Sequence, residues 1–279
     1  MTRKLGYLVV EGPHDVEFAC KIIKHRSLKK INRIQQISAL DPTFKALVPD
    51  KFPHGGDLLK RVPVPIFLQN EEFGIAIHSA GGDTKIADCL KDTVDLIGLD
   101  KFTSLGVILD SDSEEPPNIR HKKLLDLLES LKDIFPKQPG FILEAALKTG
   151  VYVFPDNKSQ GTLEDLLIEA GYFSYEKQLE SAKSFVQKIK KDCCPTEYKD
   201  LYLPAGENKS VIGAVVSLLR PGKTTQVSIQ DNNWINPRNI NDGRLKEFSD
   251  FLQHLFLTAP EPAVVAQSAT APKIGRAHV

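Results

Sequence analysis

Short apolar runs alternate with amphipathic segments along the first 170 residues of the chain. Four of these runs are bounded by turn residues and have the length of buried strands; they cover residues 5–10, 73–78, 105–110 and 150–154. The first three are followed by apolar residues at helical spacing, at 16–23, 86–96 and 119–134. Strand, turn and helix in this order are typical of βαβ units. The pattern therefore predicts an α/β fold with a mostly parallel sheet flanked by helices.

The middle and the second half of the chain depart from this alternation. Prolines and Gly55-Gly56 interrupt residues 38–70, where we expect an ordered insertion with a short strand near 62–68. Residues 171–257 are expected to form a helical extension packed on the α/β domain of residues 1–170, with helices at 179–191, 209–219 and 244–257. Trp234 is expected to be a packing anchor in this extension.

The C-terminal segment has a different composition. Residues 258–279 are rich in Ala, Pro, Val, Gln and Ser, which predicts a disordered tail. The last seven residues, 273–279, resemble one reading frame of a sequencing adapter. We interpret them as an artefact and exclude them from the fold, which leaves the natural C-terminus open.

Composition sets limits on the function. The chain has 36 basic and 36 acidic side chains, so a nucleic-acid partner requires a local basic patch rather than a basic protein. The cysteines show no C-x-x-C spacing, as expected for buried or incidental thiols in a reducing cytoplasm; they are Cys20, Cys89, Cys193 and Cys194. No apolar run is long enough to span a bilayer, and we expect a cytoplasmic protein without membrane contact.

Candidate chemistry begins where the third strand ends. Asp110 and Asp112 follow the apolar run 105–109 and, as residues two apart in a strand, are expected to point to the same side. Ligand sites of open α/β sheets lie at the carboxyl ends of the strands. Because two neighbouring carboxylates repel each other, a divalent cation such as Mg²⁺ is their expected partner.

Further acidic residues lie at the boundaries of other elements. Glu11 ends the first strand, and Asp15 lies in the first turn of the helix that follows, where it is also a candidate helix cap. Glu164 lies among leucines at the start of another helical segment. Thr162 and Asp165 have nearly the spacing of a capping box, which explains both of these residues well and Glu164 less well.

Gly81 and Gly82 form a strand-to-helix turn after the second strand. Paired glycines let the backbone approach a ligand closely, so these residues and Lys85 are candidate phosphate contacts. The spacing is not a complete G-x-G-x-x-G motif, and a lone lysine is more often a solvated side chain.

These motifs, in this order, resemble those of the Toprim family, which has a glutamate in Val-Glu-Gly and an Asp-x-Asp, each at a strand end. The corresponding residues here are Val10-Glu11-Gly12 and Asp110-Ser111-Asp112. Asp15 and Glu164 resemble the acidic residues that complete a two-metal site in OLD-type nucleases of that family. The layout is most similar to that of an uncharacterised bacterial Toprim-like family. The resemblance covers residues 5–167 and is only general from 171 to 257.

The resemblance implies phosphodiester chemistry on DNA or RNA that depends on Mg²⁺ or Mn²⁺, with a nuclease as the expected activity. Two cations can neutralise the phosphoryl oxygens and activate a nucleophile. The implied metal ligands are Asp110, Asp112, Asp15 and Glu164, and Glu11 is either a ligand or the general acid/base. Other Toprim activities are disfavoured, because the chain has no Cys/His zinc module, no P-loop at 206–210 and no region for a nucleophilic tyrosine.

A different class of function stays open. In this second interpretation the scaffold holds a metal or a nucleotide without catalysis and acts through a partner protein or as a homo-oligomer; a free nucleotide or phosphorylated metabolite is a third alternative. A nuclease predicts a positive stripe leading to the carboxylates, for which the candidates are Lys183, Lys188, Lys190, Lys191 and Lys199. A binding module predicts an acidic face without such a stripe.

Overall fold

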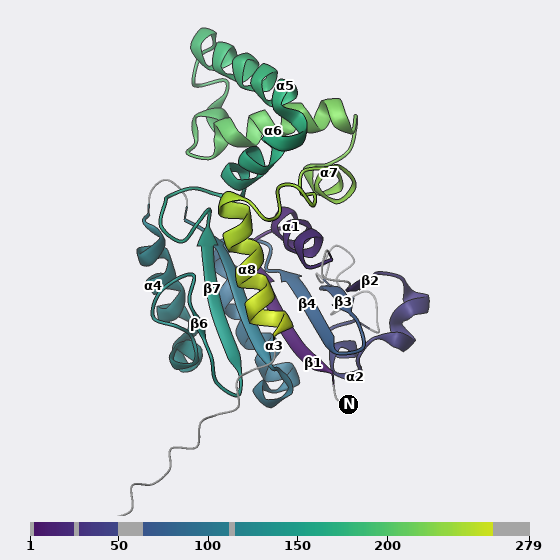
Figure 1. The fold of residues 1–279 in the computed structure, drawn as a ribbon. Helices are drawn as coiled ribbons and strands as arrows, with labels where there is room; N and C mark the ends of the chain where they lie inside the picture. The colour runs from purple at the N-terminus through teal and green to yellow at the C-terminus, as the bar shows by residue number, and fades with distance from the viewer. Residues whose placement is uncertain (1–2, 25–27, 50–63, 112–114, 259–279) are drawn as a thin grey trace, which may run out of the picture.

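The computed structural model describes residues 3–24, 28–49, 64–111 and 115–258. Within these residues, the centre of the fold is a seven-stranded sheet of order β2-β3-β4-β1-β5-β7-β6 (Figure 1). Its inner strands run parallel; β1 covers Lys4–Val10, β4 Phe73–Ser79, β5 Ser104–Asp110 and β7 Lys148–Phe154. Its outer strands pair antiparallel; β2 covers Lys29–Ile31, β3 Ile66–Gln69 and β6 Ile142–Leu143. The predicted α/β fold with a mostly parallel sheet is confirmed.

Helices cover both faces of the sheet and its carboxyl edge. One face carries α1 (Pro13–Lys24) and α8 (Gly243–Leu257), and the other carries α2 (Pro42–Lys45), α3 (Ile86–Ile97) and α4 (Pro117–Leu128). Beyond the carboxyl ends of the parallel strands lie α5 (Leu163–Asp192) and α6 (Gly206–Leu219), while α7 (Thr225–Asp231) packs against α1 (Figure 1). The 3-10 helices η1, η3, η4, η5 and η6 cover Ile34–Ala39, Asp83–Lys85, Leu99–Lys101, Glu129–Ile134 and Lys199–Tyr202. In the described parts of the chain, none of the helices combines the length and apolar character needed to cross a membrane.

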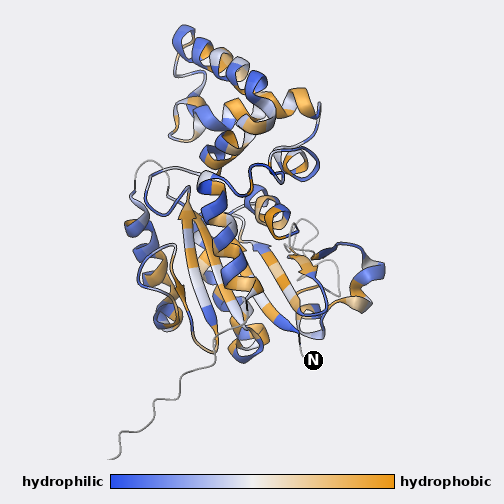
Figure 2. Ribbon diagram, viewed as in Figure 1, coloured by the Kyte–Doolittle hydropathy of each residue, from blue (hydrophilic) through white to orange (hydrophobic). Residues whose placement is uncertain are grey.

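The sheet separates two apolar cores. Along β1, Leu8 and Val10 face the core that holds α1 and α8, whereas Tyr7 and Val9 face the core that holds α3. A strand that is buried on both faces is apolar at every position rather than at every second one. Figure 2 shows this as apolar inner strands between helices that are polar on their outer sides. The short apolar runs of the sequence are therefore the inner strands of the sheet.

The observed elements differ from the predicted ones in a few places. The helix expected at 119–134 ends at Leu128 and gives way to η5, where Glu129 adopts a positive φ of 49°. The helix expected at 179–191 is the second half of α5, which bends at Tyr175. The helix expected at 244–257 is α8, which packs on β5 and β7. The sequence pattern did not reveal β2, β6 or α7.

The predicted insertion and tail are described only in part. The described residues of the insertion form η1, α2 and β3, and β3 corresponds to the expected short strand. Residues 50–63 of the insertion and the tail from 259 onward lie outside the described residues.

Three glycines let α8 lie directly on the sheet. Gly6, Gly106 and Gly150 belong to the neighbouring strands β1, β5 and β7. A Cβ atom at Gly106 would come within 2.9 Å of the Leu255 side chain, and one at Gly6 would overlap the ring of Phe256. Because neither position has room for a side chain, α8 rests on the backbone of these strands.

Candidate functional site

Four of the acidic residues singled out in the sequence lie around one cavity at the carboxyl edge of the sheet. Glu11 follows β1, Asp15 lies in the first turn of α1, Asp110 ends β5 and Glu164 lies in the first turn of α5. The cavity has a volume of about 310 Å³. Its other lining residues come from the α1 turn and from three further helices; they are Gly12, Pro13, His14, Leu163, Lys209, Ile212 and Thr225.

The second aspartate of the Asp-x-Asp motif is not described. The strand β5 ends at Asp110, and Asp112 falls in the segment 112–114, outside the described residues. The prediction that both carboxylates point to the same side of one strand therefore stays a prediction.

The carboxylates are held by the starts of the helices around them. Oδ2 of Asp15 accepts a hydrogen bond from the amide of Gly12 at 2.7 Å, so Asp15 caps its own helix as well as lining the cavity. Oδ1 of Asp110 accepts from the amide of Leu163 at 3.0 Å. Glu164 is 6% exposed, and its Oε2 is buried without a hydrogen-bond partner among the described residues. A buried carboxylate oxygen in that condition is costly unless it meets a cation or a proton.

A short hydrogen-bonded link brings Glu164 to Asp110. The amide of Ser111 donates to the carbonyl oxygen of Gly161 at 3.1 Å, and the amide of Gly161 donates to Oγ of Ser111 at 2.8 Å. This link joins the end of β5 to the start of α5. In α5, Thr162 and Asp165 form the predicted capping box, with the Thr162 amide donating to Oδ2 of Asp165 at 2.8 Å. Asp165 therefore serves the helix, and Glu164 faces the cavity.

Burial and neighbouring charges raise the pKa of two of these carboxyl groups, Asp15 and Asp110. Burial raises the pKa of Asp15 to about 7, and the charges of Glu11 and Glu164 add to the shift. Burial also raises the pKa of Asp110 well above its usual value, with further contributions from Asp15, Glu11 and Glu164. Like charges gathered in a poorly solvated place keep protons or attract cations, so this cavity favours positively charged partners.

The raised pKa of Asp15 predicts a pH dependence of stability. The folded protein holds this proton up to about pH 7, whereas an unfolded aspartate releases it near pH 4. Since the folded state then binds more protons, the metal-free protein should lose stability as pH rises from about 4 to about 7. We expect Asp15→Asn to gain roughly 1–3 kcal/mol over the wild type between pH 5 and pH 8 in urea unfolding with EDTA. The exposed control Asp100→Asn should show no such gain, and an equal response of both variants would contradict the assignment.

Gly81 and Gly82 position Glu11. Their amides both donate to the carbonyl oxygen of Glu11 at 3.1 Å, and their φ angles of 75° and 136° form the turn that makes this possible. Lys85, the third candidate phosphate contact, is exposed and does not line the cavity. The structure thus gives the two glycines a role that the motif alone did not indicate: they fix the backbone of an acidic residue on the neighbouring strand.

Two basic residues near the carboxylates were missed by the sequence analysis as parts of the site. Lys209, in the first turns of α6, lines the cavity and lowers the pKa of His14 together with burial, which is the larger cause. Arg120 of α4 donates from Nε to the carbonyl oxygen of Asp110 at 3.2 Å and pairs with Asp83 at 2.8 Å. No local motif marks either residue, because both reach the site through the packing of whole helices.

The structure tests the metal and polyanion expectations only in part. Within the described residues, no group of three His, Cys, Asp or Glu side chains is arranged to hold a metal ion. Of the lysines proposed to guide a polyanion, Lys190 pairs with Glu207 at 2.8 Å and Lys183 donates to the hydroxyl of Tyr172 at 2.6 Å. Four of these lysines lie along the second half of α5 and Lys199 lies in η6, and none of the five lines the cavity.

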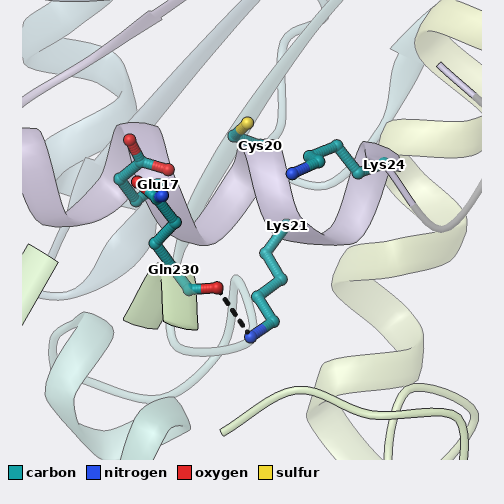
Figure 3. Close-up of a pocket in the computed structure, with 5 residues that line it drawn as sticks. All are labelled: Glu17, Cys20, Lys21, Lys24 and Gln230. Atoms are coloured by element: carbon teal, nitrogen blue, oxygen red, sulfur yellow. Dashed lines mark hydrogen bonds between the residues drawn. The ribbon is translucent and has the colours of Figure 1, made fainter. Parts of the chain in front are cut away.

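A second cavity, of about 230 Å³, lies between α1 and the end of α7 (Figure 3). Its lining residues are Glu17, Cys20, Lys21, Lys24 and Gln230. Nζ of Lys21 donates to three backbone carbonyl oxygens at the end of α7, those of Ile229, Gln230 and Asn232. Glu17 pairs with Lys30 at 2.8 Å. Lys21 and Glu17 thus already have partners in the protein, so we assign this cavity a structural role. The hydrogen bonds of Lys21 hold the end of α7 against α1.

Residues 6–257 match the model of a family described as "Protein of unknown function (DUF3226)". The chain belongs to the DUF3226 family. No curated protein matches this DUF3226 chain. Among solved structures, it is similar to the crystal structure of hypothetical protein PH0156 from Pyrococcus horikoshii OT3, with 17% sequence identity, a TM-score of 0.52, and coverage of 90% of this chain and 95% of that one. At this identity the likeness extends to the fold alone.

Proposed function

We propose that this DUF3226 protein is a divalent-metal-dependent nuclease that hydrolyses phosphodiester bonds in DNA or RNA. The observation that carries the proposal is the cavity where Glu11, Asp15, Asp110 and Glu164 converge. Bringing four carboxyl groups from separate elements together at this edge of the sheet lowers the folding stability. A ligand that binds to them best explains why they are gathered there.

The donor chemistry fits a hard divalent cation. Carboxylate oxygens are the ligands that Mg²⁺ and Mn²⁺ prefer, and Oε2 of Glu164 is buried without a partner among the described residues. Because no three of the described side chains already surround one ion, the proposal requires Asp112, outside the described residues, to complete the set formed with Asp15, Asp110 and Glu164. Glu11 would be a ligand or the general acid/base. When bound, such a cation neutralises charge on the phosphoryl oxygens and lowers the pKa of a bound water.

The chain's own positive groups suit a phosphodiester. Lys209 lines the cavity from α6 and can meet a phosphate oxygen there. The helices α1 and α5 both begin at the cavity, so their positive N-terminal ends lie beside the carboxylates. The resemblance to Toprim nucleases, including the OLD-type branch, supports the same reaction class and remains part of this proposal.

Glu164→Gln is the variant that tests the proposal most directly. It keeps the shape of a side chain that is 6% exposed and removes the charge, so the fold should survive while the affinity for the cation falls. We expect cleavage of labelled single- and double-stranded DNA and RNA with Mg²⁺ or Mn²⁺ by the wild type, none in EDTA, and a loss of at least about 100-fold in the variant.

The matched control is Glu176→Gln, the same change at an exposed position of the same helix, which should cleave like the wild type. If no substrate is cleaved but calorimetry shows that the wild type binds Mn²⁺, the nuclease is wrong and a binding module acting through a partner replaces it. Cleavage that survives in Glu164→Gln would contradict the assigned site.

A further inference from the structure

A third cavity, of about 470 Å³, lies between α5 and the segment that joins α7 to α8. Its lining residues are Phe173, Ser174, Asn233, Asn236, Pro237 and Arg238. None of them belongs to the carboxylate cavity or to the cavity between α1 and α7. The volume exceeds that of a nucleobase, so a flat ring can enter it.

Asparagine side chains hold the shape of the segment on one side of this cavity. Nδ2 of Asn239 donates to the carbonyl oxygens of Ala170 and Trp234 at 2.9 and 2.8 Å, and its Oδ1 accepts from the amide of Asn236 at 2.8 Å. Nδ2 of Asn236 reaches Oγ of Ser174 on α5 at 3.2 Å. Two of these bonds lie within the segment and two join it to α5, so the cavity wall is fixed before any ligand arrives.

Buried Trp234 and partly buried Tyr175 form an aromatic pair that packs next to the same wall. The indole of Trp234 is fully buried, donates from Nε1 to Oγ of Ser228 at 3.0 Å, and meets the ring of Tyr175 edge-on at 5.1 Å. The hydroxyl of Tyr175 accepts from the amide of Asn233 at 2.6 Å. Tyr175 is also where α5 departs from helical geometry, and the kink lies next to the lining residue Ser174.

Two side chains of the cavity are available to a ligand. Phe173 is 49% exposed although it is a large aromatic residue. Arg238 is exposed, and no hydrogen bond or ion pair within the described residues engages its guanidinium group. The cavity therefore combines an exposed aromatic ring with an unpaired guanidinium group on a wall held by hydrogen bonds. Such a combination can stack a nucleobase and contact a phosphate.

We propose that this third cavity binds a base of single-stranded nucleic acid, which stacks on Phe173 while Arg238 contacts a neighbouring phosphate. The inference rests on the proposed function and extends it to the substrate class. Phe173 follows Glu164 by nine residues on the same helix, which corresponds to about 14 Å along the axis, the length of a few nucleotides. The platform would therefore hold the strand a short distance from the carboxylate cavity.

Binding in EDTA separates this inference from catalysis. We would measure fluorescence anisotropy of labelled single-stranded DNA and RNA oligonucleotides and of a blunt duplex. Phe173→Ala should weaken single-strand binding by about 5- to 100-fold and Phe173→Trp should retain it, because a stacked base loses its platform only in the first variant. Arg238→Gln should weaken binding and lower the salt dependence by about one phosphate contact. The control Phe185→Ala removes a ring that is 60% exposed on the same helix and should bind like the wild type.

The outcomes separate the inference from the nuclease proposal. If Phe173→Ala binds like the wild type while Glu164→Gln abolishes cleavage, the platform is wrong and the nuclease stands. If nothing is cleaved but single-strand binding depends on Phe173 and Arg238, the platform stands and the catalytic proposal falls. A wild type that binds no oligonucleotide, or that binds only the duplex, overturns the platform.

Discussion

Asp110→Asn is expected to reduce metal-dependent cleavage by about 10³-fold or more, which corresponds to about 4 kcal/mol of lost transition-state stabilisation. Asp110 ends the inner strand β5, and its Oδ1 is fixed by the amide of Leu163 at 3.0 Å. An asparagine keeps an oxygen for that hydrogen bond but carries no charge for a cation. The loss should therefore appear in binding of Mn²⁺ by calorimetry as well as in cleavage.

The same change is expected to stabilise the metal-free protein at pH 8. Burial, and after it the charges of Asp15, Glu11 and Glu164, raise the pKa of Asp110, so folding disfavours the carboxylate charge that an unfolded aspartate carries at this pH. Removing that charge should increase the free energy of unfolding by about 1–2 kcal/mol, as is common where function and stability compete. Because this cost accumulates as pH rises above the pKa of an unfolded aspartate, near 4, the gain should disappear only at about pH 3.

Melting curves recorded with EDTA and with Mn²⁺ test both expected effects of Asp110→Asn, on metal binding and on stability. The wild type should gain melting temperature with Mn²⁺ at pH 8, and Asp110→Asn should start higher in EDTA and gain nothing. Asp100→Asn, an exposed aspartate remote from the cavity lining, serves as the matched control. A variant that is less stable than the wild type in EDTA and still responds to Mn²⁺ would refute the assignment. The same assay on Asp112→Asn tests the member of the pair that lies outside the described residues.

The acidic site could be anticipated because its residues lie at the ends of strongly patterned elements. Glu11 and Asp110 each follow an uninterrupted apolar run, and such runs are the inner strands of a parallel sheet. Carboxyl ends of parallel strands meet at one edge, so the pattern predicts Glu11 and Asp110 at the same edge, and the resemblance to Toprim proteins is what joined them in one site. Glu164 could be anticipated because the capping box explains its neighbours Thr162 and Asp165 but not itself.

The remaining parts of the site depend on tertiary packing that no local pattern encodes. Lys209 reaches the cavity because α6 packs along α5, and Arg120 reaches Asp110 because α4 packs against the sheet. The hydrogen bonds of Gly81 and Gly82 to Glu11 depend on the pairing of β1 with β4, residues about 70 positions apart. A glycine pair after a strand is equally compatible with a phosphate loop, so the motif could not distinguish the two roles.

The same limit applies to α8. Its apolar face is evident from the sequence, but the surface that it covers is not, and an extension packed elsewhere has the same pattern. What places α8 on the sheet is the absence of side chains at Gly6, Gly106 and Gly150 on three neighbouring strands. The three glycines lie far apart in sequence and become one surface only after the strands pair.

Gly6→Ala is accordingly expected to destabilise the protein by about 2–3 kcal/mol. The added Cβ atom would overlap the ring of Phe256 and approach Oγ of Ser104 at 2.8 Å. Relief requires α8 to lift from β1, and a close-packed interior resists that movement. At this chain length, each kcal/mol corresponds to a fall of about 2–4 °C in melting temperature, so thermal and urea unfolding both resolve the effect.

Gly213→Ala supplies the opposite expectation from the same chemical change. Gly213 lies inside α6, and a Cβ atom there would meet nothing within 4 Å. Alanine in a helix interior is favoured over glycine by up to about 1 kcal/mol, so this variant should be as stable as the wild type or more so. If both variants shift the stability in the same direction, the prediction fails, and Gly6 is not needed for the close contact between α8 and the sheet. If only Gly6→Ala is destabilised, the close packing of α8 on the backbone of the sheet is confirmed. That packing also holds β1, the strand whose end presents Glu11 to the cavity.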